Sequence, residues 1–225
     1  MVRRRTAVSL AAAGLLLAAP VLTACGSEPA HPGAAAVVGD HRIEVSTLQS
    51  QVNELRAAAA KSTQATQNFS SLNLSSEVLS RLVEDQVLAK AMADSRLTVT
   101  DNEVQKDHQA ALAQFSGSEA QLDEYLLANY GVAPTATEID HFFRRDVAAG
   151  KVIQSLGYQP GSDGGNTALS QDMVKVSKSI GVEVNPRYGT WDAQKASIGA
   201  VKDPWVVDKT PVAADAAATA AIAGQ

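Results

Sequence analysis

One extended stretch near the C-terminal end constrains the fold more than any other feature, because the rest of the chain favours helix. Residues 182–192, VEVNPRYGTWD, alternate β-branched and polar side chains and then place Pro186, Gly189 and Trp191 within six positions. A lone strand would leave its backbone amides and carbonyls without hydrogen-bonding partners. The fold must therefore bring a second strand to this late segment.

Only the start of the folding region offers such a partner. In AAAVVGDHRIEVS, two valines precede the turn pair Gly39-Asp40, after which apolar and polar residues alternate. This pattern predicts a strand with a turn, or a small hairpin. We therefore expect Val37–Val45 to pair with Val182–Asp192.

Four residues of the late segment are predicted to have structural roles. Pro186 suits the end or edge of a strand, where no backbone amide is required. Gly189 lets the chain turn, so that Trp191 folds back over the helices. Tyr188, beside Arg187, is expected to hold the junction of the strand and not to contact a ligand.

The region between the two strands carries the signals of helix. A capping box joins a Ser or Thr to a Glu or Gln three residues later at the start of a helix. Four segments fit this pattern: Ser46…Gln49, Thr100…Glu103, Ser118…Gln121 and Thr135…Glu138. Apolar residues recur at helical spacing after each of them, and after Ser76 and Ser170. Glycines end three of these stripes, at Gly131, Gly157 and Gly181.

The segment between the last two of these helices, YQPGSDGGNTA, has the composition of a turn-rich linker. The predicted fold class is therefore mainly α. It consists of a helical body closed by a small β-sheet that pairs an N-terminal strand with a C-terminal strand.

Residues 1–24 are expected to be a targeting signal outside the fold. Three arginines at positions 3–5 precede an apolar stretch, residues 7–19, that is too short for a stable membrane span. The tetrapeptide Leu22-Thr23-Ala24-Cys25 resembles the lipobox of bacterial lipoproteins, in which the cysteine is acylated and becomes the first mature residue. Lipidation at Cys25 predicts attachment to the extracytoplasmic face of the cell membrane. The alternative is an ordinary secretory signal peptide.

Composition divides the remaining chain into three parts. Residues 25–33 suit a flexible tether, residues 34–205 form the folding domain, and residues 206–225 are an alanine-rich tail predicted to be disordered. Because Cys25 is the only cysteine, no intramolecular disulfide is possible. Cleavage before Cys25 leaves 16 basic and 24 acidic residues, a formal charge of −8. Such a charge argues against nucleic acid or an anionic membrane surface as a partner.

In their order along the chain, these segments resemble the SurA N-terminal chaperone family, which is PrsA-like and related to trigger factor. The resemblance covers nearly all of residues 34–192 and is carried by the lipobox, AAVVGDHRIEVSTL, LVEDQVLAKAMADSRLTVTDNEV, FFRRDVAAGKV and VNPRYGTWD. It implies a helical body that holds extended segments of unfolded exported proteins. Many relatives insert a parvulin-type prolyl isomerase domain between the last two helices of the body. Here residues 157–169 take that place and are too few for a domain, so isomerase activity is not expected.

No pattern in the sequence predicts catalysis. Of the four histidines, His41, His108 and His141 are dispersed, with no cysteine or second histidine at metal-ligand spacing. No nucleophile elbow, phosphate loop or paired-carboxylate motif is recognisable. We therefore expect a protein that is not an enzyme and that needs no metal or cofactor.

The candidates for peptide binding are Tyr125, Phe142, Phe143, Arg144 and Arg145. Aromatic rings and guanidinium groups that line a cleft can hold varied sequences through apolar area and cation–π contact. The alternative is that the phenylalanines belong to the core and the arginines to a solvated helix face.

Together with the lipobox, the resemblance implies a membrane-anchored holdase whose partners are unfolded exported proteins. Two other classes stay open: a lipoprotein scaffold for one specific envelope partner, and an enzyme with isomerase or hydrolytic activity. Holdase and scaffold share every sequence feature, because a fold does not determine the site built on it. With only three methionines and 4% aromatic residues, the chain has little material for an adaptable apolar cleft, which keeps the scaffold open. Oligomeric state and client identity are not determined by the sequence.

Overall fold

The computed structural model describes residues 32–62, 65 and 74–199. The predicted signal peptide, Cys25, most of the tether and the alanine-rich tail lie outside the described residues. Residues 31–225 group into one compact unit by their internal contacts. Six helices and five short strands are described in it, together with one 3-10 turn, η1 (Pro186–Tyr188), which confirms the mainly α fold class.

The helices are α1 (Val45–Ala59), α3 (Leu74–Asp94), α4 (Asp101–Gln114), α5 (Glu119–Tyr130), α6 (Ala136–Ser155) and α7 (Asp163–Ile180). The strands are β1 (Ala34–Val38), β2 (His41–Glu44), β3 (Val182–Val184), β4 (Thr190–Asp192) and β5 (Ser197–Gly199).

The two ends of the described region meet in a three-stranded antiparallel sheet with the order β2-β1-β3. Val38 of the central strand β1 lies opposite His41 of β2 and Val182 of β3. The Gly39 amide at the hairpin turn also donates to the carbonyl of Gly181, at 3.0 Å. The predicted pairing of the opening hairpin with the start of the late segment is confirmed.

For the second half of the late segment the predicted pairing is wrong. After β3 the chain forms η1, and β4 then pairs with β5 in a separate two-stranded sheet, with Trp191 opposite Ile198. Pro186 cannot donate to a β-ladder, so the strand cannot continue through it. Gly189 has φ 134° and ψ −167°, a backbone conformation that is essentially limited to glycine, and it redirects the chain.

Two predicted helix starts at the N-terminal side are also wrong. α1 begins at Val45 without a side-chain cap, because β2 leads directly into it, and Ser46 lies in its first turn. Ser76 lies inside α3 instead of before it, and its hydroxyl donates to the carbonyl of Tyr188 at 2.5 Å. The remaining three capping serines and threonines do begin helices, and Thr100 forms the complete capping box with Glu103.

The last helix begins earlier than predicted, at Asp163 and not at Ser170. The Ser162 hydroxyl accepts from the Gly165 amide at 3.1 Å and caps the new first turn. A Cβ at Gly165 would lie 2.8 Å from Cγ2 of Ile153, so this glycine allows α7 to pack closely on α6. The glycine-containing start of α7 is therefore helical because of tertiary contact, although its local composition predicts a linker.

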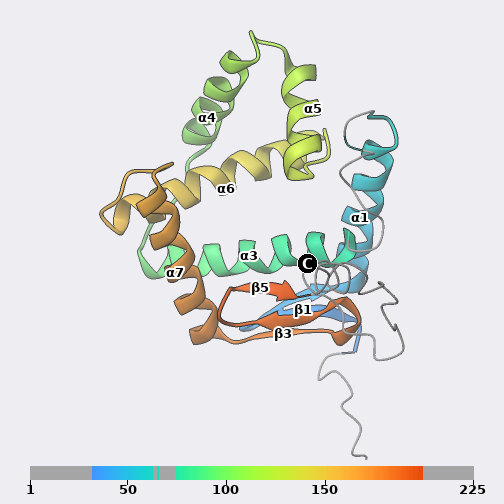
Figure 1. Ribbon diagram of the computed structural model, residues 1–225, viewed down its shortest axis with the longest axis vertical. Helices are drawn as coiled ribbons and strands as arrows, with labels where there is room; N and C mark the ends of the chain where they lie inside the picture. Colours follow the sequence, from blue (N-terminus) through green and yellow to red (C-terminus); the bar gives the residue numbers. More distant parts are fainter. Residues whose placement is uncertain (1–31, 63–64, 66–73, 200–225) are drawn as a thin grey trace, which may run out of the picture. The chain divides into compact units, whose positions relative to one another are not determined.

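Two apolar clusters hold the unit together. The first lies between α1, α3, α7 and the sheets, and Figure 1 shows α3 lying along the sheet. The second contains Val104, Leu122, Leu126, Val132 and Phe143 and joins α4 and α5 to α6. α6 contributes to both, since Phe143 belongs to the second cluster and Val152 to the first. α6 therefore links α4 to the rest of this unit, and α5 is held in addition by Leu127, which belongs to the first cluster.

Candidate peptide-binding cleft

An open cleft of about 550 Å³ lies between α4, α5 and α6. Apolar side chains from all three helices line it, beginning with Ala111 on α4 and Leu126 on α5. Each of the three helices begins at its own capping residue, and the second apolar cluster packs them together with Val132 from the connection between α5 and α6.

The cleft contains a row of aromatic rings. Successive ring centroids lie 5.1 Å apart from Phe115 to Tyr125, 5.9 Å to Tyr130, 5.3 Å to Phe142 and 5.2 Å to Phe143. These distances and the tilted or edge-on geometries are those that aromatic pairs prefer. The chain has only ten aromatic residues, and five of them stand in this row. Half of its aromatic material is therefore gathered at one surface site.

Two of these rings face solvent. Tyr125 is 41% exposed and Tyr130 is 52% exposed, whereas Phe143 is buried and Phe142 is half-buried. The pKa of Tyr130 is raised, first because its hydroxyl hydrogen bonds to Tyr125 and then because of burial. The two phenols thus satisfy each other at the rim and leave their ring surfaces available.

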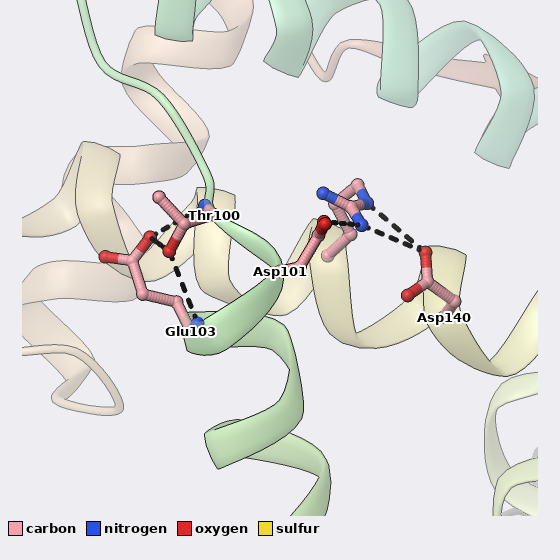
Figure 2. A network of polar contacts seen from close by, with 5 residues as sticks. Thr100, Asp101, Glu103 and Asp140 are labelled. Carbon is pink, nitrogen blue, oxygen red and sulfur yellow. Dashed lines mark hydrogen bonds and ion pairs between the residues drawn. The ribbon is translucent and has the colours of Figure 1, made fainter.

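Four of the five residues predicted to bind peptide line this cleft: Tyr125, Phe142, Phe143 and Arg145. Arg144 does not. Its guanidinium binds Asp101 at the start of α4, at 2.9 Å, and Asp140 one turn earlier on α6, at 3.2 Å (Figure 2). These two hydrogen bonds, the one to Asp101 foremost, raise the pKa of Arg144. Arg144 thus ties α4 to α6 through Asp101, the residue that follows Thr100 of the capping box.

Arg145 lines the cleft, but its charge is already balanced. Its guanidinium lies 2.6 Å from the carboxylate of Glu84 and 3.2 Å from that of Asp85, both on α3. Burial raises the pKa of Asp85, and the positive charge of Arg145 opposes that effect, with a smaller contribution from His141. This ion pair fastens α6 to α3, so Arg145 supports the cleft more than it offers a free cation.

A pair of carboxyl groups also lines the cleft, Asp107 on α4 and Asp146 on α6. Burial raises the pKa of Asp107, and the negative charge of Asp146 and a hydrogen bond between the two carboxyl groups raise it further. Oδ2 of Asp107 is buried and finds no hydrogen-bond donor among the residues that the structure describes. Sequence reasoning missed this pair because 38 residues separate the two aspartates. It also missed Phe115 and Tyr130 as cleft residues, because their helical spacing marks them only as part of a helix.

The comparison with family models agrees with the SurA N-terminal part of the resemblance found in the sequence. The profile of the SurA-like N-terminal domain family matches residues 1–131, more than half of the 225 residues. The chain belongs to the SurA-like N-terminal domain family. The search of curated proteins and the search of solved structures gave no match.

The SurA-like match places the chain in a chaperone-type fold family. It includes α4 and α5 and ends at Gly131, the residue that caps α5 in a left-handed conformation. α6 follows the matched region, so the cleft combines two helices of the SurA-like segment with one helix beyond it.

The late-segment residues of this SurA-like protein lie away from the cleft and have structural positions. Tyr188 is buried in the first apolar cluster, and Trp191 packs against that cluster while half-buried. Pro186 opens η1 and Gly189 ends it. None of the four lines the cleft.

Within residues 32–62, 65 and 74–199, no group of histidine, cysteine and carboxylate side chains is arranged to hold a metal ion. In the same residues, no helix combines the length and apolar character needed to cross a bilayer.

Proposed function

We propose that this SurA-like protein is a non-enzymatic holdase. It binds extended segments of unfolded exported polypeptides in the aromatic cleft and is anchored at the extracytoplasmic membrane face through lipid on Cys25. The observation that carries the proposal is the gathering of five of ten aromatic residues along one open cleft in a chaperone-type fold.

The chemistry of the cleft suits an unselective ligand. Ring surfaces bind apolar and cationic side chains of many shapes, because neither the hydrophobic effect nor the cation–π attraction demands one partner. The volume of about 550 Å³ lies within the range of ligand clefts and accommodates a few side chains of an extended segment. A holdase needs this tolerance, whereas a scaffold needs one complementary surface.

Isomerase activity is not part of the proposal. Residues 156–162 connect α6 to α7 directly, and a connection of this length has no room for an inserted isomerase domain. The proposed holdase therefore acts by binding and release alone.

The test is suppression of aggregation by residues 26–225, which contain the whole compact unit. Several unrelated chemically denatured proteins are diluted into buffer, and light scattering is followed. We expect near-stoichiometric protection of most of them by the wild type. Tyr125→Ala/Tyr130→Ala should need about ten times more protein for equal protection, because it removes two exposed ring surfaces, each contributing up to about 2 kcal/mol when covered.

Tyr158→Ala is the matched control. Tyr158 is 49% exposed and lies outside the cleft, so its loss should leave protection unchanged. Ala110→Trp is a second variant, which narrows the cleft from its α4 wall without removing a packed side chain. Full protection by both cleft variants would show that clients bind elsewhere. Protection of no denatured protein, with a pull-down from membranes that returns one folded partner, would replace the holdase by the scaffold.

A further inference from the structure

We infer that the cleft selects client segments in which a lysine or arginine stands two positions from an aromatic or large aliphatic residue. This inference rests on the proposed function and adds a client class to it. The observation that supports it is the position of Asp107 and Asp146 beside the aromatic row.

The charge balance of the cleft favours a cation. Asp107, Asp146 and Arg145 are the ionisable acid and base side chains in its lining, tyrosines apart. Arg145 is held by Glu84 and Asp85, at 2.6 and 3.2 Å, and supplies no net positive charge. The described residues place no basic side chain in an ion pair with Asp107 or Asp146. The cleft therefore presents negative charge that has no ion-pair partner among the described residues, next to apolar rings.

The spacing of these groups specifies where the cation stands relative to the apolar side chain. Asp146 follows Phe142 by four positions on α6, so the two side chains lie one helical turn, about 5.4 Å, apart along the same face. In an extended peptide, side chains two positions apart point to the same side and are separated by roughly 6.7 Å. An apolar side chain on the rings thus places the side chain two positions away beside the carboxyl groups.

The state of Asp107 favours the same occupant. Its carboxyl is half-buried and lacks a hydrogen-bond donor at Oδ2 within the described residues, and its pKa is raised by burial and by Asp146. An ammonium or guanidinium group supplies both the missing donors and the opposite charge. A glutamate at the same client position would meet like charge in a partly desolvated site and be rejected.

The experiment measures fluorescence anisotropy of labelled peptides with residues 26–225. Three peptides share an uncharged Gly/Ser/Asn background and carry Phe-Ser-Lys, Phe-Ser-Gln or Phe-Ser-Glu at the centre. We expect affinity to fall in that order, with about three- to tenfold between the Lys and Glu peptides, as for a partly exposed ion pair with two carboxyl groups. The difference in affinity between the Lys and Glu peptides should shrink in roughly 1 M salt, where the screening length is about 3 Å.

The decisive variant is Asp107→Asn/Asp146→Asn, which keeps side-chain shape and removes both charges. It should bind the Lys and Glu peptides equally and keep the wild-type affinity for the Gln peptide within about twofold. Asp40→Asn/Glu183→Gln makes the same change of net charge at two exposed positions of the hairpin turn and β3, and it should keep the wild-type order. Circular dichroism and melting of each variant verify that it is folded.

The outcomes separate this inference from the proposed function. Equal binding of all three peptides by the wild type would overturn the client class and leave the holdase standing. The client class would also be overturned if the control variant, like the cleft variant, no longer bound the Lys peptide more tightly than the Glu peptide. Overall charge and not the cleft would then select clients. Binding of no peptide would overturn both proposals.

Discussion

Gly189 shows how much a single backbone position contributes to this fold. With φ 134° and ψ −167° it adopts a conformation that costs a residue with a side chain about 1–3 kcal/mol. A Cβ there would lie 2.3 Å from the Gly199 carbonyl oxygen and 2.6 Å from Cγ2 of Ile198, both on β5. The glycine thus permits both the turn out of η1 and the close pairing of β4 with β5.

Gly189→Ala is therefore expected to lower the free energy of unfolding by about 2 kcal/mol or more, measured by urea denaturation. Gly117→Ala is the comparison, because Gly117 has φ 79° and no atom within 4 Å of an added Cβ. That substitution should cost only about 1 kcal/mol, from the backbone alone. Equal losses in the two variants would mean that the contact with β5 does not constrain Gly189.

At the scale of elements, the segment after α7 closes the fold. β3 completes the sheet beside β1, and Tyr188 and Trp191 contribute to the first apolar cluster. Asn185 adds contacts with the opening strand, since its backbone and side-chain nitrogens donate to the carbonyls of Ala35 and Ala34 at 2.9 and 3.2 Å. The C-terminal segment is thus joined to the N-terminal strand through backbone and side chain alike.

Deleting everything after Ile180 should lower the melting temperature by roughly 5–10 °C or more. Burial of an aromatic side chain such as Tyr188 contributes roughly 2–3 kcal/mol to the free energy of unfolding. Each kcal/mol shifts the melting temperature of a chain of this length by about 2–4 °C. Calorimetry on the truncated protein provides the measurement, and a chain that ends at residue 205 serves as the control because it keeps every described element. Unchanged melting after the deletion would refute the closing role of β3 and η1.

At the scale of the whole molecule, the proposed function includes attachment to the membrane through lipid on Cys25. Cys25→Ala should move the protein from the membrane fraction to the soluble exported fraction and abolish metabolic labelling by fatty acid, because two or more acyl chains are what give stable anchoring. Cell fractionation and labelling measure both effects. Cys25→Ala protein that stays with the membrane would mean that the apolar run at residues 7–19 is an uncleaved anchor.

The sequence by itself determined the features that arise from local chemistry. The Thr100 capping box, the left-handed cap at Gly131 and the helical spacing of apolar residues depend on neighbours within one or two turns, and the structure contains all of them. The pairing of the opening strand with residues 182–184 also followed, since an isolated strand has to find one of the few available partners.

Tertiary structure alone decided the rest, because it depends on residues that are far apart in the chain. The early start of α7 depends on the fit of Gly165 against Ile153, and the pairing of β4 with β5 depends on three-residue strands too short to show a period. Arg144 and Arg145 are neighbours in sequence, yet one binds Asp101 and the other binds Glu84 and Asp85. The aromatic row and the Asp107–Asp146 pair exist only once α4, α5 and α6 pack together, since each helix contributes part of the cleft and none contains it.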